Sequence, residues 1–138
     1  MGSVSVDDDA QAGDREPHVV PPPLTAGSVA DRVRRALHEG DVDQLGALLS
    51  PDVHWGAPGD PNPPCRNRRQ VLAWYAKGRA AGRRAAVTEV EVHGNALLVG
   101  LRLQDGHRRW QVLRVGPEGI TDIRGFENRL SALAKLPP

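Results

Sequence analysis

Hydrophobic positions in the first third of the chain recur at the spacing of an α-helix. Val29, Val33 and Leu37 fall on one face, and the residues between them are mostly charged. This pattern predicts an amphipathic helix with one buried side. Gly40 can adopt the left-handed conformation that ends a helix, and Asp41 is an N-cap residue for another helix directly after it. The chain is therefore predicted to turn sharply between two helices.

The second predicted helix is short and is followed by a strand. Leu45 and Leu48 lie on its apolar side. Pro51 is predicted to terminate it, because proline lacks a backbone N–H and clashes with the preceding turn. Val53 and Trp55 then alternate with polar residues, which is typical of a strand with one buried face.

The rest of the chain contains one more helical pattern and then only strand patterns. Proline and glycine forbid regular structure over residues 56–64, and a third helix is predicted over residues 66–81, with Tyr75 on its buried side. The predicted strands are residues 86–92, 96–104, 109–115 and 120–126. Short turns join them, so they form an antiparallel meander that the preceding helices must cover. Helices followed by strands favour an α+β fold over an alternating parallel one.

Composition fits one small domain preceded by a tail. The chain has 138 residues, of which 39% are hydrophobic, and 18 basic and 17 acidic side chains give a net charge of +1. Such a nearly neutral chain is not suited to coating nucleic acid or membranes, and we expect neither as a partner. Residues 1–23 are acidic and rich in proline, which predicts a disordered tail, and residues 24–138 form the predicted domain. The single cysteine allows no internal disulfide, so a cytoplasmic location is expected.

Two separated parts of the chain carry a resemblance to a known superfamily. Residues 32–55 run through a helix, a Gly-Asp break, a second helix, a Ser-Pro-Asp stop and a strand. Residues 110–126 form a hairpin, and residues 130–136 a closing helical tail. In this order, residues 24–136 resemble the nuclear transport factor 2-like superfamily, including its SnoaL-like and ketosteroid isomerase-like branches. The resemblance implies three helices packed on a curved, mostly antiparallel sheet, which together form a cone with an internal pocket.

The resemblance also implies which side chains line the pocket. The first strand, the third helix and one face of the meander are the expected walls, and strand alternation then assigns the positions. The expected lining is Trp55, Ala57, Tyr75, Leu98, Arg102, Gln104, Trp110, Val112, Ile123 and Gly125. Most of these side chains are apolar with a few polar tips, which is the composition of a small-molecule pocket. We therefore expect a small hydrophobic molecule as the ligand.

Ketosteroid isomerase-like members use a carboxylate base, together with a tyrosine and a protonated aspartate that stabilise an enolate. The matching positions in this chain are Ala57, Val33 and Trp110. None of these side chains can do that chemistry, so steroid-type isomerisation is not expected.

The limonene epoxide hydrolase-like branch arranges Asp, Arg and Asp, and the matching positions are Arg102, Gln104 and Gly125. Gln cannot exchange a proton at neutral pH, so this machinery is altered. Arg102 and Gln104 remain the catalytic candidates, as donors that polarise a ligand carbonyl. Catalysis would then proceed by confinement and polarisation, as in polyketide cyclase-like relatives.

Arg102 has two alternative roles. If Gly94-Asn95 forms a two-residue turn, Glu89 and Glu91 of the neighbouring strand fall on its face and form a structural ion pair with it. Otherwise the guanidinium binds a ligand carboxylate or carbonyl. These roles separate two functions. One is a pocket protein with an open cavity beside Arg102, and the other is a non-catalytic dimerising accessory or ligand-sensing domain whose own side chains fill the cone.

Metal and thiol chemistry receive little support from the sequence. The 5 histidines are scattered without paired ligand spacing, so neither a metal nor another cofactor is expected. Cys65 precedes a helix start, where the helix dipole can lower the pKa of a thiol, but a structural role is favoured.

Relatives in this superfamily commonly pair through the outer face of the sheet, so a homodimer is expected. The residues assigned to that face are Leu97, Val99, Leu101, Leu103, Leu113 and Val115. They form an apolar surface large enough for an interface unless the helices cover it.

Overall fold

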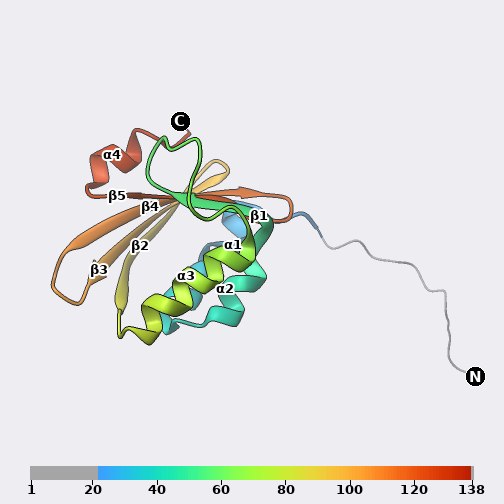
Figure 1. Ribbon diagram of the computed structural model, residues 1–138. Helices are drawn as coiled ribbons and strands as arrows, with labels where there is room; N and C mark the ends of the chain where they lie inside the picture. Colours follow the sequence, from blue (N-terminus) through green and yellow to red (C-terminus); the bar gives the residue numbers. More distant parts are fainter. Residues whose placement is uncertain (1–21, 138) are drawn as a thin grey trace, which may run out of the picture.

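A computed structural model describes residues 22–137 and confirms the α+β class (Figure 1). Its elements are α1 (Ala26–Glu39), α2 (Val42–Leu48), β1 (Leu49–Gly56), α3 (Arg68–Ala80), β2 (Ala85–His93), β3 (Ala96–Leu103), β4 (Arg108–Gly116), β5 (Gly119–Phe126) and α4 (Arg129–Leu133). The tail predicted for residues 1–23 lies outside the described residues, apart from Pro22 and Pro23. No helix in the described part of the chain is long and apolar enough to cross a membrane.

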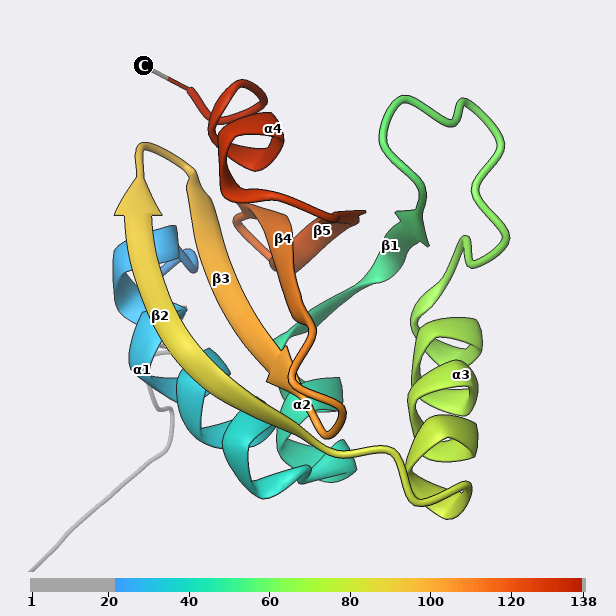
Figure 2. The same ribbon diagram turned by 90° about the vertical axis from the view of Figure 1, so that its left-hand side faces the viewer.

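The strands form one curved, 5-stranded sheet in the order β1-β5-β4-β3-β2. β1 pairs parallel to β5, and all other neighbouring strands are antiparallel. α1, α2 and α3 pack on one face of the sheet, and the short α4 packs on the other (Figure 1 and Figure 2). The curvature and the covering helices give the cone that the resemblance implied.

The two opening helices meet at the predicted turn. Gly40 has φ 65°, in the left-handed region, which ends α1. The side chain of Asp41 then accepts a hydrogen bond from the backbone N–H of Gln44 at 3.0 Å. This bond satisfies one of the free donors at the start of α2, so the break between the helices has a local cause on each side.

The boundary after α2 differs from the prediction. α2 ends at Leu48, and Pro51 lies inside β1 instead of terminating the helix. A proline is tolerated there because β1 is an edge strand. The pairing of β1 with β5 is also irregular between Leu49 and His54, where the ladder needs no donor from the proline.

Both faces of β3 are buried, and the predicted assignment of its side chains to these faces is wrong. Leu97 and Val99 pack against the helix layer of α1, α2 and α3. Leu98, which was predicted to face the pocket, packs with Val112 and with Ala132 of α4. Leu97, Leu98 and Val99 each have 0% relative exposure. Alternation along such a strand cannot indicate which face is the inside of the cone.

The β2–β3 hairpin forms through the predicted two-residue turn, with His93 opposite Ala96. A bulge between Val87 and Glu89 then shifts the register of the two strands. Because each bulge inserts one extra residue, sequence alternation cannot be carried from one end of the hairpin to the other.

The apolar row that was predicted to form a dimer interface is covered. Leu97, Val99, Leu113 and Val115 are buried in the core beneath the helices, and the rest of the row is half-buried. This row therefore offers no free surface to a second copy. The homodimer itself stays a prediction.

Candidate functional site

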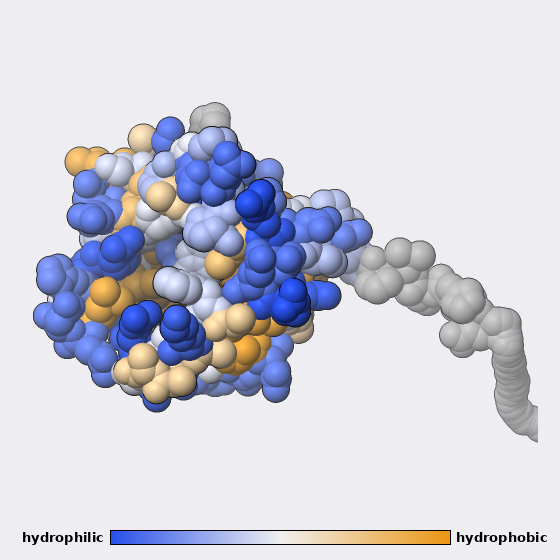
Figure 3. Space-filling model, viewed as in Figure 1, coloured by the Kyte–Doolittle hydropathy of each residue, from blue (hydrophilic) through white to orange (hydrophobic). Residues whose placement is uncertain are grey.

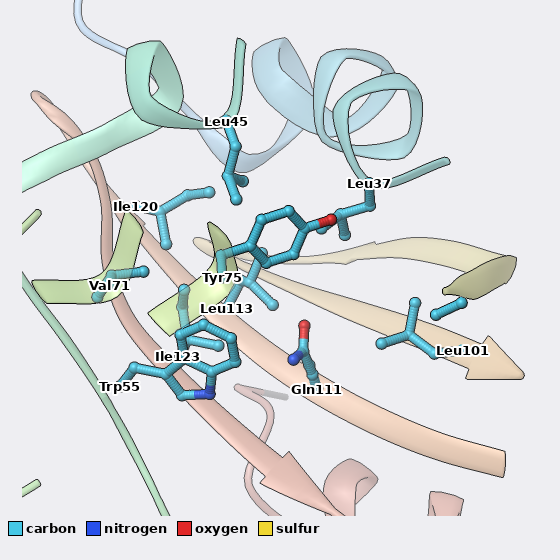
Figure 4. Close-up of a pocket in the computed structure, with 11 residues that line it drawn as sticks. Leu37, Leu45, Trp55, Val71, Tyr75, Leu101, Gln111, Leu113, Ile120 and Ile123 are labelled. Atoms are coloured by element: carbon cyan, nitrogen blue, oxygen red, sulfur yellow. The ribbon is translucent and has the colours of Figure 1, made fainter. Parts of the chain in front are cut away.

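A cavity lies inside the cone, between the helices and the face of the sheet that they cover (Figure 4). Its volume is about 70 Å³. The lining residues are Leu37, Leu45, Trp55, Val71, Tyr75, Ala85, Leu101, Gln111, Leu113, Ile120 and Ile123. They come from α1, α2, α3 and every strand of the sheet, so the whole cone contributes to this space. We call it the inner cavity.

The inner cavity continues into a wider space, which we call the mouth. The mouth has a volume of about 240 Å³ and shares with the inner cavity Leu37, Trp55, Tyr75, Ala85, Leu101 and Gln111. Its other lining residues are Trp74, Gly78, Arg79, Arg83, Arg84 and Leu103. Figure 3 shows an apolar hollow between the strands and α3, with hydrophilic residues at its edge. Even together, the two spaces only reach the lower end of the roughly 300 to 1,000 Å³ typical of ligand pockets.

Three side chains bring polar atoms to the inner cavity. Tyr75 lies one helical turn after Val71 on the inward side of α3, and its ring extends across the cavity (Figure 4). The amide of Gln111 points toward Tyr75 from β4, on the sheet side. Trp55 lies in β1 opposite Ile123 of β5, and its indole ring forms another wall. The polar atoms of α3, β4 and β1 thus converge on one apolar space.

Tyr75 is a titratable group in this lining. Burial raises the pKa of its phenol, and the positive charges of Arg79 and Arg84 act in the opposite direction. The phenol is therefore neutral at neutral pH and can donate one hydrogen bond. Among residues 22–137, no Asp, Glu, His or Lys side chain lines the inner cavity. The lining can bind and polarise a carbonyl, but these residues hold no base for proton abstraction at neutral pH.

Three of the expected pocket residues line the inner cavity, namely Trp55, Tyr75 and Ile123. Ala57 and Gly125 lie instead beside an open groove of about 800 Å³ between α4 and the loop that follows β1. Trp55 forms a wall of both spaces, so it separates the inner cavity from this groove.

Leu98, Trp110 and Val112 lie on the other face of the sheet, in the small core beneath α4. The indole N–H of Trp110 donates to Glu89 Oε1 at 3.1 Å. The prediction that these residues face the pocket is wrong, because α4 covers a second apolar face that the strand pattern did not distinguish from the first.

Arg102 and Gln104, the expected polarising donors, are exposed and line neither the inner cavity nor the mouth. Glu89 and Glu91 do not pair with Arg102 either. Both carboxylates bind Arg129 of α4, each at 2.9 Å. Glu89 lies opposite Gly100 and Glu91 opposite Leu98, as the two-residue turn predicts. The closing helix α4 nevertheless gives these glutamates a different cation. The ion pair expected for Arg102 is therefore absent, and its guanidinium lies outside the inner cavity and the mouth.

Gln111 is the polar cavity residue that the sequence analysis missed. It shares the inner row of β4 with Leu113, and that row had been assigned to the outer face. A signal was available, since an uncharged polar side chain next to Leu113 and Val115 in an alternating strand needs a partner when it is buried. Whether Gln111 faces the inner cavity or the other side of the sheet depends on which face the helices cover, and the strand pattern does not indicate that.

Cys65 has a structural role. It is buried, and its Sγ lies 3.8 Å from the backbone carbonyl oxygen of Gln70. Burial raises the pKa of the thiol, which favours the protonated form over a thiolate. Its backbone also exchanges hydrogen bonds of 2.9 and 3.3 Å with Trp55, which fixes the loop after β1 to the cavity wall.

The histidines of the described region interact with neighbouring carboxylates or lie singly. His93 contacts Glu91 at 3.1 Å, and His107 contacts Asp105 at 2.8 Å at the tip of a hairpin. The exposed His107 has a raised pKa, mainly because of the hydrogen bond to Asp105. No cluster of three or more metal-binding side chains occurs within residues 22–137.

Comparison with a family model decides the family, because the SnoaL-like domain model matches residues 30–124. The chain belongs to the SnoaL-like domain family. This confirms the resemblance that its opening helices and last hairpin carry. Among curated proteins, none matches the chain.

Solved structures of SnoaL-like and related proteins share the fold. A SnoaL-like protein of unknown function from Burkholderia thailandensis has 16% identity and a TM-score of 0.61, covering 78% of this chain and 99% of that one. A candidate polyketide cyclase from Sinorhizobium meliloti has 17% identity and a TM-score of 0.58, covering 75% and 100%. An LEH-like epoxide hydrolase from M. tuberculosis has 18% identity and a TM-score of 0.57, covering 80% and 88%. At these identities, the likeness shows the fold alone.

Proposed function

We propose that this SnoaL-like protein binds a small, largely apolar molecule in the inner cavity. The observation that carries the proposal is the lining, which is apolar except at Tyr75, Gln111 and the indole of Trp55. Apolar side chains that face an empty space lack the packing contacts that a ligand would supply. A ligand that enters would also remove its own apolar surface from water.

Tyr75 and Gln111 would orient the ligand. Both point into the inner cavity from opposite sides (Figure 4). A phenol donates one hydrogen bond, and an amide both donates and accepts, so the pair favours a ligand with a carbonyl or hydroxyl group. These residues would replace Arg102 and Gln104 as the polarising donors. If the ligand reacts, confinement and carbonyl polarisation are the means that this lining supports.

The small inner cavity supports a second candidate function. A volume of about 70 Å³ holds only several water-sized groups. A non-catalytic dimerising accessory or ligand-sensing domain would tolerate a cone that its own side chains nearly fill. The two candidates differ in whether an apolar probe binds inside the cone.

A fluorescence titration with N-phenyl-1-naphthylamine, a neutral apolar dye, tests the proposal. Ala85 lines both the inner cavity and the mouth, whereas its neighbour Ala86 pairs with Arg102 and lines neither. Ala85→Phe would fill the entrance, so we expect it to weaken dye binding by about tenfold or more. Ala86→Phe is expected to leave the affinity unchanged.

The two alanines form a matched pair, because both are half-buried at the start of β2 and the substitution adds the same ring to each. Thermal melts would confirm that both variants fold. Failure of the dye to bind the parent protein would favour the second candidate. Equal affinities of the two variants would place the dye elsewhere and contradict the proposal.

A further inference from the structure

The mouth of the inner cavity carries charge of a single sign. Arg79, Arg83 and Arg84 line it. No Asp or Glu in the described part of the chain lines either the mouth or the inner cavity. An apolar space that narrows inward from a cationic rim favours molecules with an apolar part and a negative part.

Local contacts hold the three arginines beside the mouth. Arg84 donates hydrogen bonds to the backbone carbonyls of Arg79 and Arg83, at 3.2 and 2.9 Å. The half-buried guanidinium of Arg79 lies against Gly40, where a side chain would collide with it. The backbone N–H of Arg83 donates a hydrogen bond to the carbonyl oxygen of Gly78 at 2.9 Å. The cations are therefore positioned at the rim.

Of the three arginines at the mouth, only Arg84 has a clear structural role. Arg84 serves the carbonyls at the C-terminal end of α3, where a cation is favourable. Away from the mouth, Arg124 and Arg129 bind carboxylates at 3.0 and 2.9 Å. Arg79 and Arg83 form no ion pair with any carboxylate of residues 22–137. Their donors remain available within this part of the molecule.

The rim also acts on the polar end of the inner cavity. The positive charges of Arg79 and Arg84 oppose the rise that burial causes in the pKa of Tyr75. Tyr75 lines both the inner cavity and the mouth, so its phenol and the guanidinium groups border the same partly buried space. The mouth and the cavity therefore form one electrostatic environment.

We infer that the ligand is an amphiphilic acid, whose apolar part lies in the inner cavity and whose carboxylate or sulfonate lies at the mouth against Arg79 and Arg83. The inference rests on the proposed function. A guanidinium binds a carboxylate through two parallel hydrogen bonds, which a neutral ligand cannot offer. The volumes agree with this placement, since about 70 Å³ admits a small apolar group and the wider mouth of about 240 Å³ takes the rest.

Two dyes with the same aromatic skeleton test the inference. 1-Anilinonaphthalene-8-sulfonate differs from N-phenyl-1-naphthylamine by its sulfonate group. We expect the parent protein to bind the sulfonate about tenfold more tightly than the neutral dye, and this preference should shrink as salt is added. Arg79→Gln with Arg83→Gln should abolish the preference, because it should weaken binding of the sulfonate far more than binding of the neutral dye.

Arg66→Gln with Arg69→Gln is the matched control, because it removes the same net charge from exposed positions near the other end of α3. It should keep the preference for the sulfonate. The single variant Arg83→Gln, at an exposed position, should reduce the preference even if the double variant does not fold.

The outcomes separate this inference from the proposed function. Equal binding of the two dyes by the parent protein would overturn the inference and leave the apolar pocket intact. Binding of neither dye would overturn both. An equal loss of preference in the rim variant and the control variant would show that net charge, not the rim, selects the anion, and would also overturn the inference.

Discussion

At the scale of single residues, Glu89 links β2 to β4 and α4 on the face of the sheet that α4 covers. Its carboxylate accepts hydrogen bonds from Arg129 at 2.9 and 3.1 Å and from Trp110 at 3.1 Å. The hydrogen bond from Arg129 lowers the pKa of Glu89 most, and together with that from Trp110 it outweighs burial and brings the pKa to about 2. The fold therefore stabilises the charged form of this side chain.

The pKa of Glu89 leads to a prediction about acid stability. Because the folded value lies below the usual 4.5, the stabilisation is fully present above about pH 4.5 and is lost as the pH falls toward 2. Glu89→Gln should lower the free energy of unfolding at neutral pH by about 1 to 2 kcal/mol. Urea unfolding of both proteins should show this difference vanish near pH 2.

Glu118→Gln, at an exposed turn between β4 and β5, is the control for the loss of one carboxylate. It should leave the free energy of unfolding nearly unchanged at every pH. A difference between the parent and Glu89→Gln that stays constant from pH 7 to pH 2 would contradict the assigned role of Glu89.

Some residues of β1 and β5 could be predicted, and those of β3 and β4 could not. Trp55 and Ile123 line the inner cavity as the alternation of their strands indicated. Arg102 was expected on the pocket side, and the row of Leu113, which also holds Gln111, was expected on the outer face. Both assignments failed because α4 buries the far side of the same strands. The pattern of hydrophobic residues records burial but not which element provides it.

At the scale of elements, the parallel pairing of β1 with β5 depends on a close approach at Gly119. This residue begins β5 with φ 125°. A Cβ there would come within 2.5 Å of the backbone oxygen of Leu48 and 3.0 Å of the backbone nitrogen of Ser50. Backbone atoms cannot rotate away as a side chain can, so the last turn of α2 and the start of β1 would have to move.

Gly119→Ala should therefore be among the most destabilising small substitutions in this chain. We expect it to lower the free energy of unfolding by about 3 kcal/mol or more, measured by urea denaturation. Gly106→Ala separates the two causes, because Gly106 also has a positive φ of 90° but nothing within 4 Å of the added atom. Its cost should be only about 1 to 2 kcal/mol. Equal costs at the two positions would refute the close-approach explanation.

Local signals predicted most elements but not how they cover the sheet. The turn at Gly40, the cap at Asp41 and the hairpin turn before Ala96 all lie where residue chemistry indicated. The proline inside β1 and the bulge after Val87 were not predictable, because each is tolerated only in the context of neighbouring strands. Contacts between strands therefore determine the position of the proline and of the bulge, which the local sequence does not predict.

At the scale of the whole molecule, the resemblance in the sequence identified the scaffold correctly, and the proposed function places a ligand in its cavity. The SnoaL-like cone has apolar walls from both layers and a cationic rim at the end of α3. The predicted lining was partly wrong, yet its expected character, an apolar pocket with a few polar tips, recurs on the other row of the same strands. The proposed ligand is therefore still a small apolar molecule, now with an acidic group.

Methyl NMR during a titration with N-phenyl-1-naphthylamine tests the central proposal most directly. Leu101, Leu113 and Ile123 line the inner cavity, whereas Leu98 and Val112 pack on the opposite face of the same sheet. If the ligand binds inside the cone, the methyl signals of the first set should shift with a common saturation curve, and those of the second should stay in place. Shifts confined to Leu98 and Val112, or no shifts at a saturating concentration of dye, would contradict the account.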